Sequence, residues 1–86
     1  MASYDLLIKP SAVKEIEEIG KKKDRQKVVQ RIQDLANNPR PPGCEKLSQQ
    51  NRYRVRQGWF RIIYSVDDRE KRVLVVKVGH RRDIYR

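Results

Sequence analysis

Side chains suited to phosphate groups and planar bases gather in the last third of this 86-residue chain. Arginines alternate along residues 52–56, Arg61 follows shortly after, and residues 79–85 read Gly-His-Arg-Arg-Asp-Ile-Tyr. A guanidinium group is planar and donates two parallel hydrogen bonds, which matches the geometry of a phosphate. Trp59 and Tyr85 can stack on bases, as proteins that bind single-stranded RNA commonly require. These residue types together predict an RNA-binding surface.

The net charge points in the same direction. The formal charge is +10. Residues 1–51 hold 10 Lys/Arg and 7 Asp/Glu, a net of +3, whereas residues 52–86 hold 11 Lys/Arg and 4 Asp/Glu, a net of +7. Lysine and arginine side chains that meet phosphates release counterions, so a basic domain favours a polyanionic partner. Charge alone fits a soluble domain with an incidental basic surface equally well.

Several other classes of site and partner find no support in the sequence. His80 and the single cysteine, Cys44, lie 36 positions apart and do not make a zinc site, and the four glycines form no phosphate-binding loop. We therefore expect no metal ion and no cofactor. A lone cysteine allows no internal disulfide, and no apolar run approaches the length of a membrane helix. We expect a cytoplasmic protein without a membrane partner.

The apolar periodicity predicts one α+β domain over residues 1–86, with the element order β-α-α-β-β-β. Period-2 and period-3.6 patterns separate strands from helices, and Pro, Gly and Asn mark the connections. We expect Ser11 and Asp24 to cap the two helices, and Lys21–Lys23 to form a solvated link between them. The helical hairpin should cover one face of a small, mainly antiparallel sheet. The predicted strands are 4–9, 53–56, 60–66 and 73–78, and the predicted helices are 12–19 and 25–36.

Strand alternation then places the basic side chains on the other, open face of this sheet, because successive side chains point to opposite faces. Any single arginine on a strand is more often simply solvated. Several converging arginines beside the tail of residues 80–85 favour a binding site instead. The residues expected on the open face are Arg52, Arg54, Arg56 and Arg61.

Two segments together resemble a known family. The run Tyr-Arg-Val-Arg-Gln-Gly-Trp-Phe-Arg-Ile-Ile-Tyr over residues 53–64, and the strand 73–78 with its tail 79–85, resemble the RelE/ParE superfamily of type II toxin–antitoxin toxins, most closely its RelE-like mRNA interferase branch. The strand, helical hairpin and Pro-rich link before them fit the same pattern. The resemblance implies a ribosome-dependent mRNA endonuclease that inhibits translation. It also implies mRNA and the 70S ribosome, with its 16S rRNA, as partners, together with a cognate antitoxin through which the complex binds its own operator DNA.

The resemblance also implies roles for individual residues. The RNA 2′-OH would attack the adjacent phosphate and leave a 2′,3′-cyclic phosphate and a 5′-OH, a reaction that requires no metal ion. Arg61 and Arg81 would stabilise the charge of the transition state. Tyr85 and His80 are the candidates for proton transfer, and histidine titrates near neutral pH whereas tyrosine needs nearby cations to act as a base. For His80 the alternative is a turn residue paired with Asp83. The residues expected to hold the RNA are Arg54, Arg56, Arg52 and Trp59.

Other functions stay open on the sequence alone. A ParE-type inhibitor of DNA gyrase shares the fold without nuclease activity, although that branch generally lacks the basic residues and the tyrosine. An inactive relative that acts only in autoregulation is a third possibility. The sequence ends at Arg86, which leaves no room for a helix after Tyr85. Some members of the superfamily have such a helix at the antitoxin-binding site, so the mode of inhibition also stays open.

Overall fold

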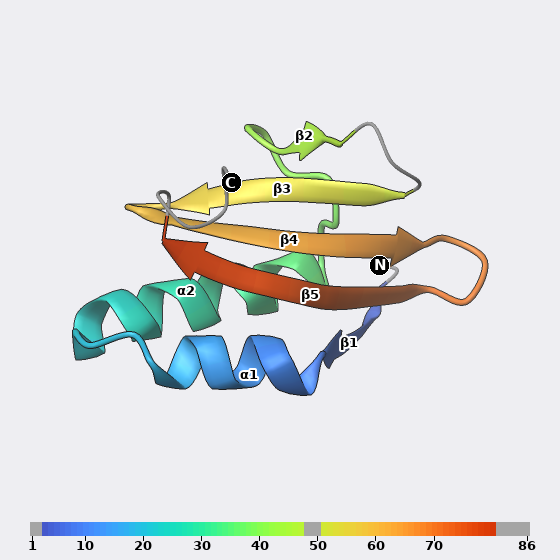
Figure 1. The fold of residues 1–86 in the computed structure, drawn as a ribbon. Coiled ribbons are helices and arrows are strands. Elements are labelled where there is room, and N and C mark those ends of the chain that lie inside the picture. Colours follow the sequence, from blue (N-terminus) through green and yellow to red (C-terminus); the bar gives the residue numbers. More distant parts are fainter. Residues whose placement is uncertain (1–2, 48–50, 81–86) are drawn as a thin grey trace.

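Two helices cover one face of a five-stranded sheet in the computed structural model, which describes residues 3–47 and 51–80 (Figure 1). The strand order is β1-β5-β4-β3-β2, with β1 parallel to β5 and the other pairs antiparallel. The predicted α+β class, helical hairpin and mainly antiparallel sheet are confirmed, but strand β2 was not predicted. The elements are β1 (Asp5–Ile8), α1 (Pro10–Glu17), α2 (Lys22–Leu35), β2 (Glu45–Lys46), β3 (Arg52–Gln57), β4 (Phe60–Asp67) and β5 (Arg72–His80).

Both helices begin earlier than the sequence predicted. Pro10 opens α1, where its missing N–H is no loss and its fixed φ suits the first helical position. The N-cap residues are therefore Lys9 and Lys21, and neither makes a side-chain capping hydrogen bond. Our predictions of caps at Ser11 and Asp24 were wrong. The lysine run was also wrongly read as a link, because α2 begins within it and Asp24 lies in its first turn, where a carboxylate favours the helix dipole.

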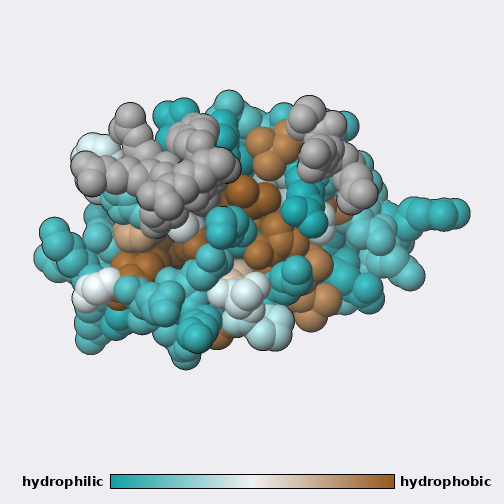
Figure 2. Space-filling model, in the orientation of Figure 1, coloured by the Kyte–Doolittle hydropathy of each residue, from teal (hydrophilic) through white to brown (hydrophobic). Residues whose placement is uncertain are grey.

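The hydrophobic core fills the space between the two helices and the sheet. Burial of apolar surface there stabilises the fold by roughly 25 cal/mol per Å². A domain of this size buries little surface in total, so its free energy of unfolding is small. Hydrophobic residues gather where α1 meets β5, and hydrophilic residues surround them (Figure 2). The core consists of Ala12, Ile16, Ile19, Val28, Ile32, Leu35, Tyr53, Val55, Ile62, Tyr64, Val66, Val73, Val75 and Val78.

A β-bulge lies in the middle of β5. The pairing of β4 with β5 shifts between Ile63 and Tyr64, whose partners are Lys77 and Val75, so that Val76 is an extra residue. A bulge of this kind increases the local twist and redirects the side chains that follow it. The last residues of β5 therefore face the opposite way from what an unbroken alternation from Val73 would give.

A polar cluster connects three segments, which are Tyr4 before β1, Arg40 in the Pro-rich connector and Asp68 in the β4–β5 loop. The Arg40 guanidinium donates two hydrogen bonds to the Asp68 carboxylate, at 2.9 and 3.2 Å, and its Nε donates to the Tyr53 hydroxyl at 3.0 Å. The Tyr4 hydroxyl donates to Asp68 at 2.8 Å. These hydrogen bonds lower the pKa of Asp68 from 3.8 to about 2, and the hydrogen bond from Arg40 contributes most.

None of the helices in residues 3–47 and 51–80 is long and apolar enough to span a membrane.

The polar cluster should make stability depend on acidity. The lowered pKa of Asp68 means that its contribution is fully present above about pH 4 and is lost as the pH falls through about 2. Asp68→Asn should therefore lower the midpoint of thermal unfolding at neutral pH, and the difference from wild type should shrink towards pH 2. Glu17→Gln, on the exposed side of α1, is the control. Equal midpoints for wild type and Asp68→Asn at every pH would contradict this account of the cluster.

Candidate nucleic-acid interface

The sheet face opposite the helices carries a group of arginines, here called the arginine face and defined by Arg54, Arg56 and Arg61. Arg56 lies directly across from Arg61 in the β3–β4 pairing, and Arg54 lies two residues before Arg56 on the same face. Like charges directly opposite each other in a sheet are destabilising, so a bound anion would relieve the repulsion. Arg52 shares this face but sits four residues from Arg56, roughly 13 Å along the strand, and therefore lies away from the pair.

Arg61 is buried, which corrects the prediction of a fully open face. Only 4% of its surface is exposed, and its strand β4 is flanked by strands on both sides. Its cross-strand neighbour on β5 is Gly79, which has no side chain to compete with the arginine for space on this face. Arg61 lines an open hollow of about 290 Å³, here called the arginine hollow, together with Arg56, Gly58 and Trp59.

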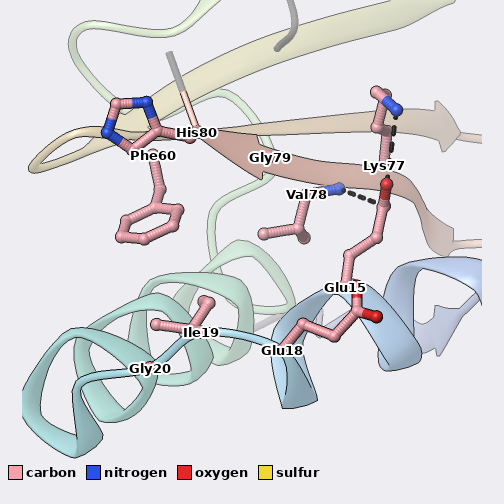
Figure 3. Close-up of a pocket in the computed structure, with 9 residues that line it drawn as sticks. All are labelled: Glu15, Glu18, Ile19, Gly20, Phe60, Lys77, Val78, Gly79 and His80. Carbon is pink, nitrogen blue, oxygen red and sulfur yellow. Dashed lines mark hydrogen bonds and ion pairs between the residues drawn. The ribbon is translucent and has the colours of Figure 1, made fainter. Parts of the chain in front are cut away.

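The end of β5, which carries Gly79 and His80, is held in place by α1. Beyond the last residue paired with β1, the Glu15 carboxylate accepts a hydrogen bond from the Val78 N–H at 2.9 Å. The same carboxylate lies 3.3 Å from the Lys77 ammonium (Figure 3). The Glu15 side chain thus accepts the backbone hydrogen bond that no neighbouring strand accepts at this edge of β5. This contact fixes the backbone that positions Gly79 beside Arg61.

Three aromatic rings meet next to the β3–β4 turn. Trp59 lines the arginine hollow, whereas Phe60 and His80 line a different pocket beside Glu15 of α1 (Figure 3). His80 is paired with Phe60 across the strands, and its ring meets the edge of the Phe60 ring at a centroid distance of 5.7 Å and 81° (Figure 3). The rings of Trp59 and His80 are nearly parallel, at 13°, with centroids 6.5 Å apart. The structure therefore brings Trp59 together with Arg56 and Arg61 at the arginine hollow, and it stacks His80 on Trp59. Arg81 and Tyr85 lie outside the described residues.

Glu45 on β2 also belongs to this site, although its sequence context did not predict it. Its carboxylate lies 3.0 Å from the Arg54 guanidinium and 4.0 Å from that of Arg56. The side chain of Arg54 is 15% exposed and that of Arg56 is 61% exposed, so Arg56 is the more accessible of the two to a ligand. A two-residue strand is too short to give a periodic pattern, and only the pairing of Glu45 with Arg54 brings it to this face.

Removal of the Glu45 charge should strengthen binding of polyanions. Glu45→Gln keeps the shape of the side chain but no longer offsets Arg54 and Arg56. Because exposed ion pairs contribute about 0.2–1 kcal/mol, we expect an increase of about two- to fivefold in the affinity for single-stranded RNA, with a steeper salt dependence. Fluorescence anisotropy at several salt concentrations measures both. Glu70→Gln, in the distant β4–β5 loop, is the matched control, and an equal effect of the two substitutions would contradict a role for Glu45.

The structure resembles those of several solved toxins. It superimposes on the RelE–RelB complex of Pyrococcus horikoshii OT3 with a TM-score of 0.82 and 26% identity, covering 92% of this chain and 96% of that one. The toxin–antitoxin complex RelBE2 of Mycobacterium tuberculosis gives a TM-score of 0.80 at 22% identity, with 93% of each chain covered. The isolated E. coli RelE toxin gives 0.79 at 22% identity, covering 91% of this chain and 84% of that one. At such identities the last two establish a shared fold.

Sequence comparisons identify the family. Toxin RelG of Mycobacterium tuberculosis (strain ATCC 25618 / H37Rv) is 41% identical over 34 residues, which span 40% of this chain and only 39% of that relative. The family model of the ParE toxin of the type II toxin–antitoxin system parDE matches residues 6–85. Because that match includes both helices and, except for Asp5, all five strands, the chain belongs to the ParE toxin family and is a type II toxin of the RelE/ParE superfamily.

Proposed function

We propose that this toxin is an endoribonuclease, an mRNA interferase that cleaves mRNA in the ribosomal A site and thereby inhibits translation and arrests growth. The observation that carries the proposal is the cross-strand pair of Arg56 and Arg61 beside Trp59, around one hollow on the sheet. Two guanidinium groups at a hollow suit a phosphate, and an exposed tryptophan suits an adjacent base. The similarity to solved RelE toxins supports the same assignment.

The reaction would be an intramolecular transesterification. The RNA 2′-oxygen forms a bond to the adjacent phosphorus and loses its proton, while the bond from phosphorus to the 5′-oxygen breaks and that oxygen gains a proton. A 2′,3′-cyclic phosphate and a 5′-OH result. Arg61 and Arg81 would stabilise the charge on the phosphorane-like transition state, and Arg52, Arg54 and Arg56 would hold the backbone. Tyr85 is the first candidate for the two proton transfers, and His80 is the alternative.

The proposed partners follow from this activity and from the relatives. The substrate is mRNA on the 70S ribosome, where 16S rRNA forms part of the A site, so the toxin would act in the cytoplasm. We also propose a cognate antitoxin that silences the toxin, since the similar structures from Pyrococcus horikoshii OT3 and Mycobacterium tuberculosis are toxin–antitoxin complexes. The complex would bind its operator DNA through the antitoxin.

A translation extract tests the proposal. Purified toxin is added to one defined mRNA, either with ribosomes held on the message or after the ribosomes have been removed, and the new 5′ ends are mapped. We expect cuts within codons only on ribosome-bound mRNA. Cleavage that is absent in both arms would overturn the proposal.

Inhibition of DNA gyrase is the alternative, and the specific observation that favours it is the match to the ParE toxin model. Gyrase-linked DNA breaks with intact mRNA after induction of the toxin would support this alternative.

A further inference from the structure

Trp59 is exposed next to the arginine hollow, and His80 stacks on it. Trp59 is 62% exposed, although burying an indole would stabilise the fold. It follows directly after Gly58, whose φ of +60° permits the tight β3–β4 turn. The turn therefore lifts the indole out of the core and places it beside the arginine hollow, where it lines the same space as Arg56 and Arg61.

The relation between the two rings suits a planar ligand. The Trp59 and His80 rings are stacked on each other with an offset, because their planes differ by only 13° and their centroids are 6.5 Å apart, within the range of aromatic pairs in contact. A base that stacks on one ring is thus also aligned with the other. The edge contact with Phe60 holds the imidazole in this orientation.

We propose that Trp59 and His80 together bind one nucleobase of RNA by stacking, next to the phosphate held by Arg56 and Arg61. In this site His80 acts through its aromatic ring and not through the gain and loss of a proton. The role of this site in cleavage rests on the proposed function. The site adds the part of the RNA that is recognised, namely one base.

Binding can be tested without any cleavage. Trp59 is the only tryptophan of the chain, so its fluorescence reports on this site alone. A single-stranded oligoribonucleotide should quench the fluorescence, and an oligonucleotide of the same length and charge with abasic residues should quench it far less. His80→Leu should weaken binding of the first oligonucleotide, whereas His80→Phe should keep most of it. Equal quenching by the two oligonucleotides would overturn the proposal.

Cleavage by the variants in ribosome-loaded extract tests the role of each ring. Trp59→Leu and His80→Leu should each lower cleavage by about 10- to 100-fold, as expected for loss of stacking on one base. Trp59→Phe and His80→Phe should restore activity to within about threefold of wild type, and His80→Phe should keep the pH profile of the rate. Val29→Ala, which shortens an exposed apolar side chain of α2, is the control. If His80→Phe is as inactive as His80→Leu, the proposed ring-only role of His80 is wrong.

The base could belong to the mRNA or to the ribosomal RNA, and the same extract separates the two. Loss of an mRNA contact in Trp59→Leu should change the preferred nucleotides at the cut. Loss of an rRNA contact should instead raise the ribosome concentration needed for half-maximal cleavage and leave those nucleotides unchanged. Should wild type fail to cleave mRNA at all, the proposed function fails, while selective quenching by the base-containing oligonucleotide would still establish the stacking site.

Discussion

Arg61→Ala is expected to lower mRNA cleavage by about 10²- to 10³-fold while the protein stays folded. Loss of one preorganised donor to a transition-state charge typically has an effect of this size. Arg61 is restricted in its motion, because only 4% of its surface is exposed and its strand is paired on both sides. The substitution also removes one member of a like-charged pair, since Arg56 lies directly opposite, so unfolding should not become much easier.

Two further variants separate geometry from charge in this test. Arg61→Lys keeps the positive charge but loses the planar pair of donors, so its cleavage rate should fall between those of wild type and Arg61→Ala. Arg72→Ala removes an arginine at the opposite end of the sheet, where β4 and β5 join the loop, and should cleave almost like wild type. Equal losses of cleavage rate in Arg61→Ala and Arg72→Ala would mean that the arginine face contributes only general positive charge.

The largest loss of stability is expected from Ile62→Ala, the next residue on β4. Ile62 is fully buried beneath the helices, and truncation of a buried isoleucine to alanine lowers the free energy of unfolding by about 2–5 kcal/mol. Domains of this kind are stable by only about 5–15 kcal/mol in total. The substitution should therefore shift the urea midpoint strongly and leave part of the protein unfolded at elevated temperature.

Ile63→Ala is the matched control for this loss of stability. The same side chain is removed from the same strand, but Ile63 lies on the arginine face between Arg54 and Lys77 and is only partly buried. Its loss of stability should be clearly smaller. Equal losses for the two substitutions, measured by urea unfolding, would contradict the assignment of the two faces of β4 to the core and to the arginine face.

Much of the fold could be predicted because burial imposes simple periods on the sequence. Strands β1, β3, β4 and β5 and both helices show alternating or helical apolar patterns, and the structure confirms them within a few residues. The starts of the helices could not be predicted as well, because Pro10 and the lysine run replaced the expected caps. Strand β2 was missed, because two residues carry no pattern.

The arrangement of the candidate site could be predicted only in part. Alternation is a local property, so the sequence predicted that Arg54, Arg56 and Arg61 share a face. The pairing of Arg61 with Gly79 depends on the bulge in β5, and the approach of Glu45 depends on the pairing of β2 with β3, which no local pattern reveals. The parallel rings of Trp59 and His80 likewise depend on the pairing of β4 with β5.

The central claim is that the arginine face cleaves mRNA, and mapping of mRNA 5′ ends in growing cells tests it most directly. Wild type is compared with Arg54→Ala/Arg61→Ala/Arg81→Ala after induction of equal amounts of protein. We predict abundant new ends within codons for wild type, with growth arrest, and neither effect for the triple variant. Growth arrest by wild type with intact mRNA, or a triple variant as toxic as wild type, would contradict the claim.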